Sequence, residues 1–298
     1  MTDSLAAGRP NPVSGSGAGL SGSSALWVAL PILVLAACFF YPLSLILGQA
    51  LAGESGSLSL ATLHAVFAAA VFRDAVWHTI SIALAASASC LILGFILALI
   101  LSFVPFPGST IAARLVDSFI SLPTFLIALA FTFLYGSAGI LNLSLMQAFG
   151  LSLPPVDFLY SAWGVILAEV TVYTPFVLRP LLASFSLIDA AQIEIAASLG
   201  ASPWRIIRQI ILPAALPALA AGGSLCLLLT VNEFGIVLFI GAKGVITLPL
   251  LVYDKAIQEF DYTAACAIAL VNILLSLGLY SLYRVALGRF GGRRAGLV

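Results

Sequence analysis

The chain has 298 residues, of which 62% are hydrophobic and only 8% are charged. Soluble domains carry roughly 25% charged residues, so this composition excludes an ordinary water-soluble fold. The formal net charge is zero, which gives no sign of nucleic-acid binding. Because the few charges lie between long apolar runs, the sequence predicts an all-α polytopic membrane protein.

The N-terminal region raises the question of a cleaved signal sequence. Residues 1–25 are rich in Ser, Gly, Pro and Ala, with Arg9 as their only basic residue, so we expect a disordered cytoplasmic tail. Ala50-Leu51-Ala52 resembles a cleavage site after the first apolar run. However, the run at 26–47 exceeds the roughly 7 to 15 apolar residues of a signal peptide. We therefore favour an uncleaved first transmembrane helix.

Six stretches are long and apolar enough to cross a bilayer, for which about 20 helical residues suffice. They are residues 26–47, 76–102, 116–136, 159–182, 214–240 and 263–285. Pro123 and Pro175 are expected to mark bends, and Met146–Phe149, before Pro154-Pro155, is expected to form a short helix that dips back. The predicted parts are a tail at 1–25, the first helix and an outer segment at 26–75, a five-helix core at 76–285 with a loop at 189–213, and a basic tail at 286–298.

The basic residues predict the orientation. Cytoplasmic loops carry an excess of Lys and Arg. With both termini in the cytoplasm, only Arg73, Lys243 and Lys255 face outward. The basic residues that then face inward are Arg9, Arg114, Arg179, Arg205, Arg208, Arg284, Arg289, Arg293 and Arg294.

The loop at 189–213 carries clear start and stop signals for two short helices. Asp189 can cap the first helix, with Gln192 three residues on as in a capping box. Gly200 suits the position just after that helix. Ser202 and Pro203 are typical of the N-cap and first position of a second helix, which is expected to run to about residue 211.

One side of this loop is apolar, formed by Ile195, Leu199, Ile206, Ile207 and Ile210. A compact, weakly charged pair of helices at the inner membrane face is suited to contact with a partner protein. The alternative is an ordinary loop helix that lies among lipid headgroups.

Five positions in this loop carry a family resemblance. Glu194, Gly200, Ile210, Leu212 and Pro213 are spaced as in the E-A-A-x-x-x-G-(x)9-I-x-L-P loop, and the chain resembles binding-protein-dependent ABC permeases of this type. The loop precedes the final two spans, as it does in that family.

The resemblance extends from Trp77-His78-Thr79 to Arg284, which is most of the chain. Two positions depart from the motif. Ile195 stands where the first Ala is usual, and Ile193 stands where many members have a second acid. The glycine turn and the final Leu-Pro are retained, so the departures concern fine contacts of the loop.

The resemblance implies a type I ABC importer permease in a bacterial inner membrane. It implies cytoplasmic ATP-binding subunits, a second permease (identical or a sister chain), a periplasmic or extracellular substrate-binding protein and membrane lipid as partners. Residues 194–199 would form a coupling helix that sits in a groove of the ATPase. ATP binding would draw paired coupling helices together and turn the cavity outward. The coupling residues implied are Glu194, Ile195, Ala196, Leu199, Gly200, Ile210, Leu212 and Pro213.

No phosphate-binding G-x-x-x-x-G-K-[ST] loop occurs in the sequence, so ATP is expected to be handled by a partner. The chain itself is expected to have no catalytic residue, cofactor or metal. His64 and His78 lack a ligand pattern, and the four cysteines are far apart in apolar runs, typical of packing residues.

Three polar residues within the predicted spans are candidates for a translocation path. They are Glu169 in the fourth span and Asn232 and Glu233 in the fifth, where a charge would cost about 2.5 to 3.5 kcal/mol unless it is paired, hydrated or near an interface. We expect them to face the bundle interior or a water-filled path; the alternative is a structural pair or an interhelical hydrogen bond. On a helix, Asn232 and Glu233 would point about 100° apart, so at most one would face the path centrally. Arg179 is expected to snorkel toward lipid phosphates.

Two other function classes were weighed. An intramembrane enzyme would need paired aspartates or a Ser and His from different spans, and His78 is the only candidate base. A stand-alone secondary transporter or channel would leave the loop motif unexplained and typically shows inverted repeats.

The stretch from Asn232 to Lys255, followed by Phe260-Asp261-Tyr262, resembles permeases for 2-aminoethylphosphonate. Iron(III), polyamine, thiamine and sulfate permeases share much of this layout. The resemblance therefore favours the phosphonate, with those four as the other substrate candidates.

Overall fold

The computed structural model describes residues 22–51 and 60–291. Within these ranges every regular element is helical, which confirms the predicted all-α class. Six helical stretches are long and apolar enough to cross a membrane, as predicted. They are Trp27–Ala50, Ala70–Phe103, Thr124–Phe149, Ala162–Phe185, Pro203–Val231 and Tyr262–Leu287.

The chain divides into two units, residues 1–46 and 47–298. In the first, α1 (Gly22–Leu35) is followed by a π-helical turn (Ala36–Phe40) and the start of α2 (Tyr41–Ala50). The wide turn comes just before Pro42, and the Tyr41 N–H bonds to the Ala36 carbonyl. Most of the predicted disordered tail lies outside the described residues.

The second unit contains the remaining helices. They are α3 (Ala61–Ala68), α4 (Ala70–Phe103), α5 (Ser109–Ser118), α6 (Thr124–Tyr135), α7 (Ile140–Phe149), α8 (Ala162–Phe185), α9 (Ala190–Ser198), α10 (Pro203–Ile206), α11 (Leu212–Val231), α12 (Gly235–Ile240), α13 (Leu248–Tyr253) and α14 (Tyr262–Gly291). A 3-10 turn (Phe119–Ser121) and two π-helical turns (Ile207–Ile211 and Asp254–Gln258) complete it.

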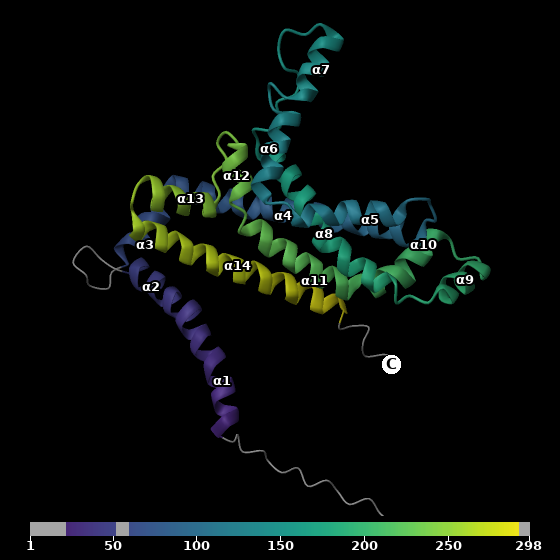
Figure 1. Cartoon of the computed structure of the whole chain (residues 1–298), viewed down its shortest axis with the longest axis horizontal. Helices are drawn as coiled ribbons and strands as arrows, with labels where there is room; N and C mark the ends of the chain where they lie inside the picture. The colour runs from purple at the N-terminus through teal and green to yellow at the C-terminus, as the bar shows by residue number, and fades with distance from the viewer. Residues whose placement is uncertain (1–21, 52–59, 292–298) are drawn as a thin grey trace, which may run out of the picture. The chain divides into compact units, whose positions relative to one another are not determined.

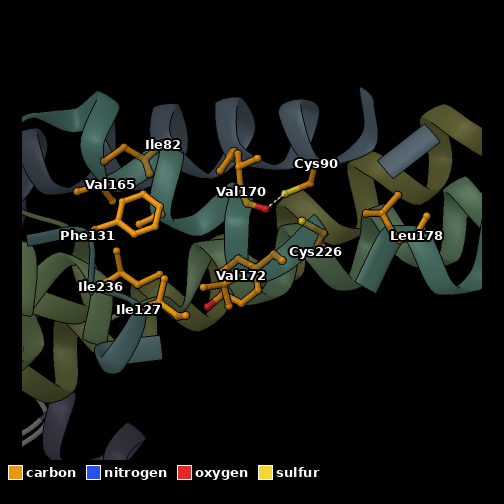
Figure 2. Packing of buried hydrophobic residues seen from close by; sticks show 14 of the residues in the cluster. Ile82, Cys90, Ile127, Phe131, Val165, Val170, Val172, Leu178, Cys226 and Ile236 are labelled. Atoms are coloured by element: carbon orange, nitrogen blue, oxygen red, sulfur yellow. Dashed lines mark hydrogen bonds between the residues drawn. The ribbon is translucent and has the colours of Figure 1, made fainter. Parts of the chain in front are cut away.

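The core of the second unit lies where α4, α8 and α11 pack against one another, and α14 packs on α11 and α13 (Figure 1). Its largest hydrophobic cluster also includes side chains of α6 and α12. Figure 2 shows this cluster, in which the Cys90 sulfur lies 3.9 Å from the Val170 carbonyl oxygen. Cys90 and Cys226 are both fully buried there, as expected for packing cysteines.

Glycines let the backbone of α11 approach its neighbours closely. A Cβ added at Gly222 would lie 3.0 Å from the Val177 Cα of α8. One added at Gly223 would lie 2.0 Å from the Tyr283 hydroxyl of α14. Since lipid tails are as apolar as leucine, small residues that permit close packing are a main source of helix association in membranes.

The third span begins later than the predicted residue 116. The backbone leaves the helical conformation at Leu122 (φ −88°, ψ 133°) and Pro123 (φ −58°, ψ 137°), and α6 starts at Thr124. Proline lacks an N–H and disfavours a helical conformation in the residue before it. The proline therefore separates α5 and its 3-10 turn from the apolar stretch. Met146–Phe149, expected as a short helix, forms the end of α7.

The fifth span also differs from the predicted range 214–240. Helix is continuous from Pro203 to Val231, then breaks at 232–234 before α12. Pro213 does not interrupt the helix, because the preceding turn is π-helical and the Leu212 N–H bonds to the Ile207 carbonyl. The second loop helix and the span therefore form one rod, and the polar pair Asn232 and Glu233 lies in a break.

Candidate functional site

The first helix of the loop at 189–213, α9, starts with the predicted cap. Asp189 has an extended backbone, and its Oδ1 accepts a hydrogen bond of 2.9 Å from the Ala191 N–H. This bond satisfies one of the free N–H groups at the helix start and fixes where α9 begins.

The end of α9 is a Schellman turn around Gly200. Gly200 has φ +81°, and its N–H bonds to the Ala197 carbonyl at 2.9 Å. The next N–H, of Ala201, bonds to the Ala196 carbonyl at 3.0 Å. Only glycine adopts this left-handed conformation at little cost, so the predicted role of Gly200 as the turn residue is confirmed.

The second loop helix restarts two residues later. Pro203 occupies its first turn as predicted, and Ser202 stands before it with an extended backbone. The Ser202 side chain makes no capping hydrogen bond, but its carbonyl accepts from the Arg205 N–H at 2.9 Å. The start of this helix is therefore set mainly by Pro203, whose ring fixes φ, and not by a hydrogen bond from the Ser202 hydroxyl.

The loop has two apolar faces, where the sequence predicted one. Ile195, Leu199 and Trp204 are 59%, 82% and 70% exposed. Ile206 and Ile207, placed by the sequence on the same side as Ile195, instead pack against the main core. Exposed apolar side chains gathered on one short loop are typical of a protein contact surface. Trp204 was not among the residues singled out from the sequence.

The inner apolar face lies against the C-terminal end of α4. A cavity of about 320 Å³ remains between them. Its lining is Leu99, Ile100, Phe103, Val104, Ile193, Pro203, Ile206, Ile207 and Ile211. The loop is therefore seated on the transmembrane helices through aliphatic contacts, while its outer face remains available.

A buried carboxylate holds the break after α11. Glu233 is 6% exposed, and its Oε1 accepts a 2.8 Å bond from the Ile236 N–H. Its Oε2 accepts a hydrogen bond from the Tyr173 hydroxyl of α8. Glu233 thus links the first turn of α12 to α8. An interhelical hydrogen bond of this kind was the alternative to a path-lining role in the sequence analysis.

Glu169 belongs to the same cluster, one helical turn before Tyr173 on α8. It is 1% exposed and interacts electrostatically with Glu233. Its Oε2 has no hydrogen-bond partner among the described residues. Glu169 therefore faces the bundle interior, one of the two environments expected for it.

Asn232 points away from these carboxylates. Its Nδ2 donates to the Leu228 carbonyl at 2.8 Å and to the Ser276 hydroxyl at 3.3 Å, and its Oδ1 accepts from Asn272 at 3.0 Å. Because Asn232 and Glu233 lie in a break, the expected 100° helical separation does not apply to them. Asn232 is exposed, whereas Asn272 and Ser276 of α14 are buried.

Sequence reasoning missed Tyr173, Asn272 and Ser276. Each is a polar residue inside a predicted span, so a full search for such residues would have found them. Their pairing with Glu233 and Asn232 depends on helix packing, which the sequence does not give.

Arg179 has a different partner from the expected lipid phosphates. Its Nε donates to the Asp117 Oδ1 at 2.8 Å, and the two side chains are 54% and 36% exposed. No group of three or more potential metal ligands occurs in the described part of the chain. His78, the one candidate base, has its Nδ1 3.2 Å from the Ile246 carbonyl oxygen.

The Tyr173→Phe change tests whether the buried cluster is structural. It removes the donor to Glu233, and a buried acceptor left without its donor costs about 1 to 3 kcal/mol. We expect the apparent Tm in detergent to fall by several degrees. Tyr280→Phe is the matched control, because that half-buried hydroxyl makes no hydrogen bond within the described residues. Equal Tm values for the two variants would contradict a stabilising role.

The six helical spans and the helical loop at 189–213 define a polytopic membrane protein. The chain belongs to the family of binding-protein-dependent transport system inner membrane components, which it matches over residues 90–292. It is thus a permease of an ABC importer. This finding overturns the alternative of a stand-alone carrier or channel.

Two relatives and one solved structure illustrate the match. PhnU of Salmonella typhimurium, named a 2-aminoethylphosphonate transport system permease protein, is 63% identical over 90% of this chain and 94% of its own length. The sulfate transport system permease protein CysT of Escherichia coli is 32% identical over 69% of this chain and 73% of its own. A bacterial alginate ABC transporter shares the fold, with a TM-score of 0.76, 19% identity, and coverage of 89% of this chain and 95% of that chain.

Proposed function

We propose that this chain is the membrane-spanning subunit of an importer for 2-aminoethylphosphonate. The observation that supports this choice of substrate is the 63% identity to PhnU along nearly the whole of both chains. The sulfate permease is about half as similar and matches a shorter part of the chain.

The outer face of the cytoplasmic loop is the proposed seat of the ATPase. It presents Ile195, Leu199 and Trp204 with little burial, and burial of apolar surface drives association of this kind. The proposed coupling residues are Glu194, Ile195, Ala196, Leu199, Gly200, Ile210, Leu212 and Pro213. Because Pro203 to Val231 is one helix, a movement of the loop would pass directly to the fifth span.

The translocation path is proposed to run past the break at 232–234. Asn232 is exposed there, and Glu233 and Glu169 lie buried beside it. A second permease, identical or a sister chain, would complete the path. Both termini are proposed to be cytoplasmic, on the charge asymmetry of the loops.

Deletion of the gene tests whether 2-aminoethylphosphonate is the transported substrate. In a bacterium that carries it and has no second importer, the deletion should abolish growth on 2-aminoethylphosphonate as sole phosphorus source. Growth on inorganic phosphate should be unchanged, since that nutrient uses other carriers. Unchanged growth on the phosphonate would refute the proposal that 2-aminoethylphosphonate is the substrate.

Co-purification tests the partner. The protein, isolated from native membranes in mild detergent, should bring an ATP-binding subunit with it, identified by mass spectrometry. Leu199→Glu should weaken this association, because it places a charge on the exposed apolar face. Leu153→Glu, at an exposed leucine between α7 and α8 that lies outside the spans, should not weaken it. Failure to recover an ATPase even after crosslinking would contradict the proposed coupling site.

A further inference from the structure

A second cavity lies among the transmembrane helices, apart from the buried carboxylates. It has a volume of about 320 Å³, at the lower end of the roughly 300 to 1,000 Å³ of small-ligand sites. It is lined by Ile120, Phe176, Arg179, Pro180, Ala221, Gly222 and Leu225. Arg179 is therefore the one charged side chain in an otherwise apolar lining.

The position of this cavity places the guanidinium on the inner part of the bundle. Arg179 lies six positions before Phe185, the last residue of α8, which is a distance of about 9 Å along the helix axis. With the cytoplasmic loop following α8, that end faces the cytoplasm on the orientation proposed above. Gly222 lets α11 approach α8 closely beside the cavity; a Cβ there would lie 3.2 Å from the Pro180 Cγ.

Arg179 is free to exchange its present partner. Within the described residues its Nε donates a hydrogen bond to the Asp117 Oδ1, and both side chains of this pair are partly exposed. An incoming anion that replaces Asp117 would keep the guanidinium in a charge-assisted hydrogen bond. The guanidinium offers planar, paired donors that match phosphate-like groups.

We infer that Arg179 binds the phosphonate group of the transported substrate in this inner cavity before release to the cytoplasm. The inference rests on the proposed substrate. Lipid headgroups offer the same oxyanion chemistry to this open cavity between α8, α11 and the turn at 119–121, so the experiment below compares the two sources.

Chemical protection of wild-type protein tests this contact directly. Phenylglyoxal modifies exposed guanidinium groups, and mass spectrometry reads the extent at each arginine. In lipid-depleted detergent, 2-aminoethylphosphonate and methylphosphonate should slow modification of Arg179, and propylamine, which lacks the phosphonate, should not. Arg114, an exposed arginine of α5 outside the cavity, should be modified at the same rate throughout. Protection by phosphatidylglycerol but by neither phosphonate would assign the site to lipid and overturn the inference.

Transport by the complete importer gives the second measurement. In liposomes supplied with the loaded binding protein, Arg179→Gln should lower uptake per ATP hydrolysed by about tenfold or more, from the loss of charged hydrogen bonds. Arg179→Lys should lie between, since it keeps the charge without the planar fork. Arg114→Gln is the matched control for the loss of one positive charge.

Asp117→Asn separates binding from a purely structural ion pair. A structural role predicts that Asp117→Asn and Arg179→Gln lose uptake equally, whereas the inference predicts a much smaller loss for Asp117→Asn. Equal losses, or wild-type uptake in Arg179→Gln, would overturn the inference. If the wild type itself imports no 2-aminoethylphosphonate, the proposed substrate fails instead, and methylphosphonate protection of Arg179 still decides the anion contact.

Discussion

Gly200→Val should abolish co-purification of the ATP-binding subunit and, with it, import. At φ +81° a residue with a Cβ is strained, by roughly 1 to 2 kcal/mol for an ordinary side chain and by more for a β-branched one. The chain relieves this strain by leaving the left-handed conformation. The two bonds from Gly200 and Ala201 back into α9 then break, and the exposed Ile195 and Leu199 turn away from their present direction.

Two variants control for the added bulk. No atom lies within 4 Å of a Cβ built at Gly200, so steric collision does not explain a loss there. Ala201→Val places the same side chain one residue on, where φ is not positive, and should retain the ATPase. Gly200→Asn should retain part of it, because Asn tolerates the left-handed region. Full association of the Gly200→Val protein would show that the turn does not position the contact surface.

The sequence predicts local features of this molecule well where the signal is local. Asp189, Gly200 and Pro203 act through their own backbone neighbourhood, and the structure confirms all three. The six spans are likewise evident, because about 20 apolar residues have few alternatives to a membrane helix. The predicted helix boundaries are wrong near two prolines, because a proline can either end a helix or lie within one. Pro123 separates two helical elements, whereas the helix continues through Pro213 after a π-helical turn.

The tertiary environment of polar residues is less predictable. Periodicity placed Ile195 and Ile206 on one side of the loop, yet the turn at Gly200 rotates the second helix so that Ile206 packs inward. Glu169 and Glu233 were recognised as costly in lipid, but their shared cluster with Tyr173 joins positions 60 residues apart in sequence. Only the packing of α8 on α11 and α12 brings them together, and no local pattern encodes it.

Gly223→Leu should prevent stable assembly of the transmembrane core. A Cβ at this position would lie 2.0 Å from the Tyr283 hydroxyl oxygen and 2.9 Å from the Leu91 Cδ2, so these side chains, or the helices that carry them, must shift. The same displacement breaks the 2.8 Å hydrogen bond from the Tyr283 hydroxyl to the Leu219 carbonyl. Overpacking of a core typically costs about 1 to 3 kcal/mol, and here a hydrogen bond is lost in addition. We expect little monodisperse protein after extraction in mild detergent.

The neighbouring helix provides the matched control. No atom lies within 4 Å of a Cβ built at Gly278 of α14, so Gly278→Leu adds the same side chain to a span without collision. Leucine is the better helix former in both cases, so helix propensity cannot produce a difference between them. Tyr283→Ala combined with Gly223→Leu should recover part of the monodisperse fraction, because it removes the ring that the new side chain meets. Equal yields of the two single variants by size-exclusion chromatography would mean that α11 and α14 do not pack as closely at Gly223 as the structure indicates.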